Sequence, residues 1–361
     1  MSLQMADHES GAAVVAATLM YAEAGEAGAT IARFLDRNRD TLAMLGARLR
    51  ALSPAMVVTC ARGSSDHAAT YAKYRVETLL GVPTVSAAFS TVSLYDAQPA
   101  QADAGASTLC IAISQSGRSP DLLATVERQR ASGALVVALV NDESSPLADV
   151  ADVMLPLCAG PETSVAATKS YIASLAGIAA IVAAWRDDDA LRADLAALPA
   201  LVDIAFALDW SSAVRGLRDA TNLFLVSRGY GLAIAQEAAL KLKETCGLHG
   251  EAFSSAEVRH GPMAIVQAGF PVIAFDTGGV AGEDVRALAD TFAERGARVW
   301  LASNAETAHP AIERLPALAV SPELAPIVMI ASFYRMVNAL ALARGYDPDQ
   351  PPYLAKVTRT R

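Results

Sequence analysis

Unbroken apolar runs alternate with helical patterns along this chain. The runs TLCIAI (108–113) and ALVVALV (134–140) show no polar alternation, which is typical of parallel strands buried on both faces. Between them, Leu122, Leu123 and Val126 recur at helical spacing. Strands that alternate with helices in this way predict an α/β fold with a doubly wound parallel sheet.

The same pattern occurs twice. VVTCARGSSDHAATYAKYRVETLLG (57–81) aligns with LFLVSRGYGLAIAQEAALKLKETCG (223–247), and CIAIS (110–114) aligns with VIAFD (272–276). Internal repetition of a strand–turn–helix unit indicates two copies of one domain. We therefore expect two tandem doubly wound domains with parallel sheets, each flavodoxin-like with three α/β/α layers.

The two copies and their flanks predict four segments. They are a helical lead-in over 1–45, a first domain over 46–200, a second domain over 210–345, and an irregular tail over 346–361. The longest uncharged apolar run, YIASLAGIAAIVAAW (171–185), is shorter than the roughly 20 residues that cross a bilayer. We expect a buried helix there and no membrane span.

Composition limits the kinds of binding partner and the cell compartment that we expect. A net charge of −9 and a pI near 5.1 argue against binding to nucleic acid, which needs a basic face. The first ten residues, MSLQMADHES, are polar and do not resemble a signal peptide. The scattered cysteines Cys60, Cys110, Cys158 and Cys246 suggest neither a disulfide framework nor zinc. We expect a cytoplasmic protein without a metal.

A polar cluster follows the strand predicted at 108–113. Ser114, Gln115, Ser116 and Ser119 surround one glycine at a strand-to-helix turn, where free backbone N–H groups and the helix dipole favour an anion such as phosphate. Ordinary N-capping by serine is the alternative. Neither G-x-G-x-x-G nor a Walker motif occurs in the chain, so we expect no nucleotide cofactor, and no other cofactor is indicated.

Six ordered motifs carry a resemblance that spans nearly the whole chain. They are RGSSDHA (62–68), SQSGRSPD (114–121), PETSVAATKSY (161–171), SRGYGLAIAQEAALKLKE (227–244), EVRHGPMAIV (257–266) and PPYLAKVT (351–358). With these motifs the chain resembles the sugar isomerase (SIS) family, and specifically the isomerase half of glucosamine-6-phosphate synthase and its relatives.

The resemblance implies which residues hold the substrate. The phosphate-binding residues would be Ser64, Ser65, Ser114, Gln115, Ser116 and Ser119. In the sugar-binding segment, Glu162 would orient the sugar, and Ala167 stands where the family has a serine, so that one hydroxyl contact is missing.

The resemblance also implies the acid–base residues. Glu244 would shuttle a proton between C1 and C2, and Lys241 would assist at the C1 oxygen. Spacing alone places these two side chains on one helix face, where a surface ion pair is the ordinary explanation. His260 would open the sugar ring and would reach the site of the neighbouring subunit, which implies a homodimer.

Lys356 resembles the family lysine that forms a Schiff base with the ketose carbonyl. Attack needs the neutral amine, which burial favours. Pro351, Pro352, Tyr353 and Leu354 precede it and are able to dock the tail. A solvated lysine in a basic tail is the alternative.

The resemblance leaves several activities open. Synthases of this family carry a glutaminase domain with a cysteine nucleophile, whereas the first cysteine here, Cys60, lies in a predicted strand. We therefore expect isomerising deamination of glucosamine-6-phosphate to fructose-6-phosphate and ammonia. The alternatives are synthesis from free ammonia or with a separate glutaminase, a deaminase or deglycase for another phosphorylated amino sugar, and a non-catalytic sugar-phosphate sensor. The sugar epimer and the direction stay open.

Overall fold

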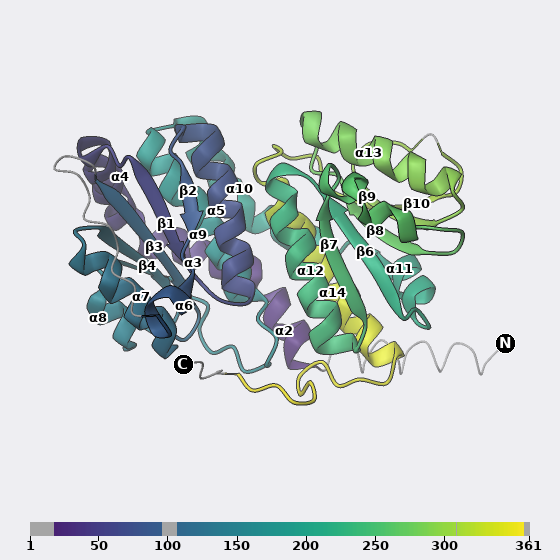
Figure 1. Cartoon of the computed structure of the whole chain (residues 1–361), viewed down its shortest axis with the longest axis horizontal. Coiled ribbons are helices and arrows are strands. Elements are labelled where there is room, and N and C mark those ends of the chain that lie inside the picture. Colours follow the sequence, from purple (N-terminus) through teal and green to yellow (C-terminus); the bar gives the residue numbers. More distant parts are fainter. Residues whose placement is uncertain (1–17, 96–106, 308, 357–361) are drawn as a thin grey trace. The chain divides into compact units, whose positions relative to one another are not determined.

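The computed structural model describes residues 18–95, 107–307 and 309–356. The described chain divides into two compact units. Unit 1 contains the residues up to Ala27, then Glu162–Lys169 and Ala200–Lys356, and unit 2 contains Gly28–Pro161 and Ser170–Pro199. Each unit is built on one sheet with helices on both of its faces (Figure 1).

The sheet of unit 2 has five parallel strands in the order β2-β1-β3-β4-β5. This is the flavodoxin-like order. Val57 pairs with Thr84 on one side and with Leu109 on the other, so β1 is a central strand. The strands are β1 (Met56–Cys60), β2 (Thr84–Ser86), β3 (Thr108–Ser114), β4 (Leu135–Val140) and β5 (Val153–Pro156).

Helices cover both faces of this sheet. On one face, Phe89, Leu122 and Leu147 from three helices join a buried cluster with strand residues such as Ala112. On the other, Gly177 lies so close to Leu139 that a Cβ there would be 2.8 Å from Cδ2 of the leucine. The helices are α3 (Ala27–Arg37), α4 (Arg39–Leu52), α5 (Ser64–Leu80), α6 (Phe89–Ser93), α7 (Pro120–Ala131), α8 (Pro146–Val150), α9 (Lys169–Arg186) and α10 (Asp189–Phe206), the last of which continues into unit 1.

The sheet of unit 1 repeats this topology. Its order is β10-β9-β8-β6-β7, which is the same flavodoxin-like sequence of strands read from the other edge. All four strand pairs are parallel. The strands are β6 (Asn222–Ser227), β7 (His249–Ser254), β8 (Pro271–Phe275), β9 (Arg298–Ser303) and β10 (Ile312–Pro316).

Unit 1 is also covered on both faces. One face buries Val285 and Phe292 of α13 against the strands. On the other, the ring of Phe275 packs against the rings of Trp210 and Phe333, with centroids 6.3 and 6.2 Å away. The elements are α2 (Leu19–Gly25), α11 (Ser211–Leu217), η1 (Gly229–Gly231), α12 (Leu232–Cys246), η2 (Glu257–His260), η3 (Pro262–Ile265), α13 (Gly279–Glu294) and α14 (Ala325–Ala343).

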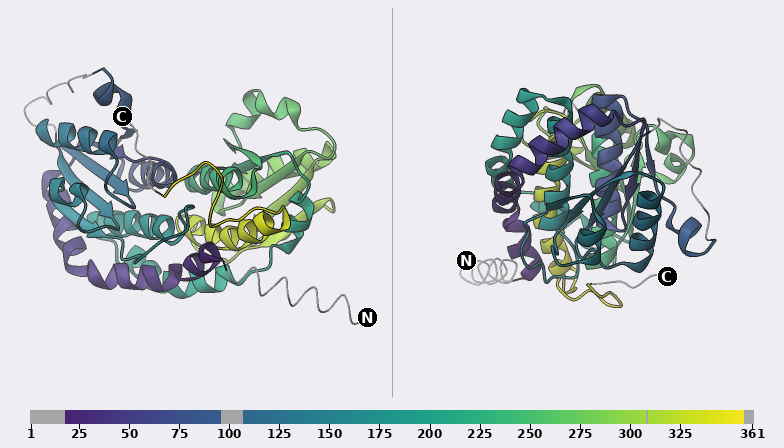
Figure 2. Two further views of the ribbon diagram at one scale, coloured as in Figure 1. Left: turned by 90° about the horizontal axis from the view of Figure 1, so that it is seen from below. Right: turned by 90° about the vertical axis from the view of Figure 1, so that its left-hand side faces the viewer.

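The predicted fold class is confirmed. Two parallel sheets with the same strand order and helices on both faces are two tandem doubly wound α/β domains (Figures 1 and 2). The predicted buried helix at 171–185 lies inside α9. One described helix, α14, is long and apolar enough to cross a bilayer by composition, but 83% of its apolar window is buried in the protein, as expected of a core helix.

Arg75 is a buried cation on α5. Its side chain is fully enclosed, at 0% exposure, and among the described residues none of its three guanidinium nitrogens has a hydrogen-bond partner. Its guanidinium carbon lies 5.7 Å from the ring centre of Tyr71, which offers a cation–π contact. That contact only partly offsets the cost of removing a charge from water.

Replacing Arg75 with methionine should therefore stabilise the protein. Methionine fills much of the same volume without the charge, and we expect the free energy of unfolding in urea to rise by about 1–4 kcal/mol. Lys73→Met, at an exposed position of the same helix, should change it by less than about 0.5 kcal/mol. A loss of stability in Arg75→Met alone would contradict the prediction and would mean that the guanidinium has a counter-ion.

Candidate functional site

Two helix N-termini lie at the carboxyl ends of neighbouring strands in unit 2. Helix α5 begins at Ser64, after β1, and α7 begins at Pro120, after β3. In the order β2-β1-β3 the connections from β1 and β3 leave in opposite directions, which makes this the topological switch point of the sheet. Free N–H groups and helix dipoles converge there, so this edge can bind an anion.

Glycines shape both turns of this edge, which we call the polar cradle and which consists of Gly63–Ser65 and Ser114–Ser119. Gly63 has φ +57° and Gly117 has φ +62°, a backbone region that favours glycine. A Cβ on Gly117 would also lie 2.2 Å from Oγ of Ser145. The turns therefore need glycine for backbone reasons, independently of any ligand.

The six residues predicted to bind phosphate all lie in this cradle. Ser114 is buried, and its Oγ accepts a hydrogen bond from the N–H of Gly117 at 3.0 Å, so part of its role is to hold the turn. Ser119 occupies the N-cap position of α7, but its side chain makes no capping hydrogen bond. The half-buried members are Ser64, Ser65, Gln115, Ser116 and Ser119. Ordinary capping thus does not account for the hydroxyl of Ser119.

Arg62, beside the cradle, and Arg118, within it, are paired with carboxylates of the chain. Arg62 donates through Nε and Nη2 to Oδ2 of Asp121, at 3.2 and 2.8 Å. Arg118 donates to Oδ2 of Asp142 at 3.0 and 2.8 Å. A hydrogen bond from Ser144, followed by the one from Arg118, lowers the pKa of Asp142. Neutral donors are therefore the main groups that the cradle offers to an anion.

The equivalent edge of unit 1 is filled by a carboxylate of the chain itself. In the repeat, Asp276 aligns with Ser114. Its carboxylate accepts hydrogen bonds from the N–H of Gly278 at 2.8 Å, from Arg286 at 2.6 Å and from Oγ of Ser303 at 2.6 Å. Because these donors already hold an anionic group, they are not available to a bound anion at this edge of unit 1.

Lys241 lies between two carboxylates on α12. Its Nζ is 2.5 Å from Oε2 of Glu244 and 3.4 Å from Oε1 of Glu237. Glu237 is fully buried and also accepts a hydrogen bond from the hydroxyl of Tyr334 at 2.9 Å. Sequence reasoning missed Glu237 and Tyr334. Glu237 could have been found, because it lies four residues before Lys241 and therefore on the same helix face.

The pair of carboxylates decides the protonation of Lys241. Burial by itself lowers the pKa of this amine, but the charges of Glu237 and Glu244 outweigh burial and raise it. Lys241 is therefore a cation that can donate a proton or a hydrogen bond. Glu244, whose side chain is 21% exposed, is the member of the group that solvent or a substrate can reach.

Lys356 is held by the segment that contains the predicted sugar-binding residues. Its Nζ donates to the carbonyl of Ser164 at 2.7 Å and to Oε2 of Glu162 at 3.3 Å. Glu162 is buried and its Oε1 accepts from the N–H of Thr168 at 3.0 Å. The Oγ of Ser164 and the Oγ1 of Thr168 are buried without a hydrogen-bond partner among the described residues, and such groups gain free energy from any polar partner.

One detail of the predicted tail docking is wrong. Pro351 is buried, but Tyr353 is fully exposed and Leu354 is 47% exposed. Polar contacts of the tail, rather than its aromatic and aliphatic side chains, carry its attachment, and Lys356 itself is only half-buried.

The other predicted residues take separate places in unit 1. His260 ends η2 and is exposed, and Ala167 is half-buried in the Glu162–Lys169 segment. Unit 1 thus brings Lys241 together with Glu244, and Lys356 together with Glu162, whereas the polar cradle belongs to unit 2. Over the described ranges, no three or more His, Cys, Asp or Glu side chains gather as metal ligands would.

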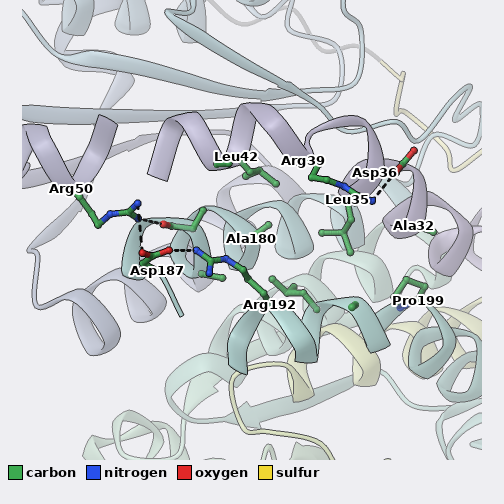
Figure 3. A pocket seen from close by; sticks show the side chains of 15 residues that line it. Ala32, Leu35, Asp36, Arg39, Leu42, Arg50, Ala180, Asp187, Arg192 and Pro199 are labelled. Atoms are coloured by element: carbon green, nitrogen blue, oxygen red, sulfur yellow. Dashed lines mark hydrogen bonds and ion pairs between the residues drawn. The ribbon is translucent and has the colours of Figure 1, made fainter. Parts of the chain in front are cut away.

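Unit 2 also contains an apolar groove of about 700 Å³ between α3, α4, α9 and α10 (Figure 3). Its floor is formed by alanines and leucines, and its arginines are paired with neighbouring acidic groups, as Arg39 is with Asp36 at 3.1 Å. None of the predicted site residues lines this groove. The groove is therefore distinct from the cradle of Gly63–Ser65 and Ser114–Ser119.

Comparison with known proteins identifies both units. The SIS domain profile matches residues 54–184 and 216–343. A glutamine–fructose-6-phosphate aminotransferase (isomerizing) of Thermococcus kodakarensis is 33% identical over 313 residues, which are 83% of this chain and 51% of the relative. The chain thus spans about half the length of the curated relatives it matches.

Solved structures agree with this result. A structure from Silicibacter pomeroyi DSS-3, named as a candidate phosphosugar isomerase, is 42% identical with a TM-score of 0.86 and covers 92% of this chain and 100% of its own. The C-terminal domain of glucosamine-fructose-6-phosphate aminotransferase from Francisella tularensis has the same fold, with a TM-score of 0.80 at 23% identity over 93% of this chain and 98% of its own. The chain therefore belongs to the SIS domain family.

Proposed function

We propose that the chain catalyses the isomerising deamination of glucosamine-6-phosphate to fructose-6-phosphate and ammonia. The observation that carries this proposal is the contact of the buried Lys241 with the partly exposed Glu244, whose Nζ and Oε2 lie 2.5 Å apart. An aldose–ketose isomerase needs a carboxylate that accepts a carbon-bound proton. It also needs a proton donor, such as an ammonium, beside the neighbouring oxygen. The phosphate would bind in the cradle of Ser64, Ser65 and Ser114–Ser119.

The proposed reaction begins with ring opening by His260. Glu244 removes the proton from C2 and returns it to C1, while the C1 oxygen takes a proton from Lys241 and becomes a hydroxyl. The C2–N bond becomes a C=N bond, and the nitrogen returns one proton to Lys241, which is again an ammonium. Lys356 then adds to C2, ammonia leaves, and water hydrolyses the new imine to release fructose-6-phosphate and the free lysine. One water is consumed for each ammonia formed.

The four cysteines of this chain do not supply the nucleophile of a glutaminase. A glutaminase of the type that serves this family needs a reactive thiolate. Burial raises the pKa of Cys246 to about 11 and also raises that of Cys158, and a hydrogen bond with Cys60 together with burial raises that of Cys110. Cys60 is buried in β1. Within this chain no thiol has the character of such a nucleophile.

We further propose a cytoplasmic homodimer in which His260 serves the neighbouring site. Its exposed side chain at the end of η2 supports this arrangement, because a residue that acts in another subunit must lie at the surface.

The function is tested by incubating the purified protein with glucosamine-6-phosphate and measuring ammonia and fructose-6-phosphate together. Equimolar release of both is the expected result. Binding of the sugar phosphate without any release would contradict the proposal and would indicate another amino sugar phosphate or a sensor. A second assay supplies fructose-6-phosphate and ammonium instead. Net formation of glucosamine-6-phosphate in that assay, without net deamination in the first, would indicate the synthetic direction.

A further inference from the structure

Asp349 joins the C-terminal tail to the start of α2. Its Oδ2 accepts a hydrogen bond from the N–H of Leu19 at 2.7 Å, and its Oδ1 accepts one from the N–H of Met20 at 2.7 Å. These N–H groups open a helix and have no partner within it, so a carboxylate is well placed there. The carbonyl of Asp349 also accepts from the N–H of Val165 at 3.4 Å. One residue thus connects the tail, α2 and the segment of residues 162–169.

Glu23 connects α2 to the same segment from another side. It is buried, at 6% exposure, and accepts hydrogen bonds from the N–H groups of Thr163 and Ser164, the latter at 3.2 Å to Oε2. Burial raises the pKa of Glu23, whereas the N–H of Thr163 and the charge of Lys356 act in the opposite direction. A buried carboxylate with two backbone donors fixes the segment at its N-terminal end.

Lys356 contacts the residue that Glu23 holds. The N–H of Ser164 points to Glu23, and the carbonyl of Ser164 accepts from Nζ of Lys356 at 2.7 Å. Helix α2, which carries Glu23, packs firmly in unit 1. Met20 is fully buried, and the ring centroid of Tyr21 lies 5.1 Å from that of Phe206.

We propose that Glu23 and Asp349 are positioning residues that place the amine of Lys356 by fixing the 162–169 segment and the tail on α2. The role of that amine rests on the proposed function, but the attachment itself does not. Covalent attack depends on an amine held within a fraction of an ångström of its target. Loss of either carboxylate should therefore slow imine formation more than it weakens binding of the sugar phosphate.

Glu23→Gln and Asp349→Asn test the proposal in the full chain. Glu283→Gln and Asp203→Asn, both at exposed positions, are matched controls that remove the same charges. The first readout is amide hydrogen exchange of the peptide that contains residues 346–356, compared with that of α12. The second is the rate at which borohydride traps fructose-6-phosphate on Lys356, where loss of water forms the imine and hydride reduces it to a secondary amine.

In both variants we expect amide hydrogen exchange of the tail to rise about tenfold, while that of α12 stays unchanged. The rate of borohydride trapping and kcat should fall about tenfold or more, and KM should change less than about threefold. Exchange and trapping equal to those of the controls would overturn the proposal. If Glu23→Gln does not fold, Asp349→Asn decides the matter with the same criteria. If wild-type protein traps no sugar while the variants still loosen the tail, the proposed chemistry of Lys356 fails and the attachment is supported.

Discussion

Glu244→Gln should lower kcat by about 10³-fold or more while leaving binding of the sugar phosphate nearly unchanged. The substitution keeps the size of the side chain and one acceptor oxygen but cannot hold a proton, and a positioned general base contributes about 10²–10⁴-fold to a rate. Lys241 keeps Glu237 as an anionic partner at 3.4 Å, so its charge stays compensated and the protein should fold. Steady-state kinetics, together with titration of fructose-6-phosphate, measure the two effects separately.

The same variant tests the assignment of the base by isotope exchange. Wild-type protein should exchange the C1 protons of fructose-6-phosphate with D₂O, and Glu244→Gln should not. Glu251→Gln, at an exposed position of β7, is the control and should behave as wild type. Loss of binding and turnover together in Glu244→Gln would count against its role as the base.

Mixing variant subunits tests the shared site. Glu244→Gln and His260→Ala protein are each inactive in this scheme. A mixed dimer regains one intact site, so random exchange of subunits should restore about a quarter of wild-type activity. No recovery after subunit exchange would place His260 in the site of its own subunit.

Local patterns predicted the fold class because they are strong and repeated. The apolar run at 108–113 became β3, Thr108–Ser114, and the helical spacing after it became α7. The strand order could not be read in this way, since pairs such as Val57 with Leu109 join residues far apart in the chain. The repeat predicted only that both copies share one order, and the structure shows which order that is.

The contacts of the candidate site are likewise of two kinds, those between residues close in the sequence and those between residues far apart in it. Lys241 and Glu244 are three residues apart, and their contact follows from helix geometry. The contact of Glu237 with Tyr334 links residues 97 positions apart, and that of Glu23 with Thr163 links residues 140 positions apart. No local pattern marks such partners, and they became visible only when the tertiary structure placed them against the predicted residues.

The position of Lys356 changes the argument for its reactivity. The amine does not lie in an apolar site, because Nζ donates to the carbonyl of Ser164 and to the carboxylate of Glu162. In this arrangement Glu162 is therefore the group best placed to take the proton when the amine attacks. The carboxylate proposed to orient the sugar would thus also serve the nucleophile.

Lys356→Met should abolish covalent trapping of fructose-6-phosphate by borohydride and lower the rate of ammonia release by about 10²-fold or more, because the reaction loses its nucleophile and must hydrolyse the ketimine directly. Folding should be spared, since the tail around Lys356 is largely exposed and contributes little to the core. Removal of residues 355–361 should give the same loss without a change in melting temperature. Lys243→Met, at an exposed position of α12, should trap sugar at the wild-type rate. Full activity in the truncated protein would exclude Lys356 from the chemistry, whereas a secondary amine found by mass spectrometry on the peptide that contains it would identify the attacking group directly.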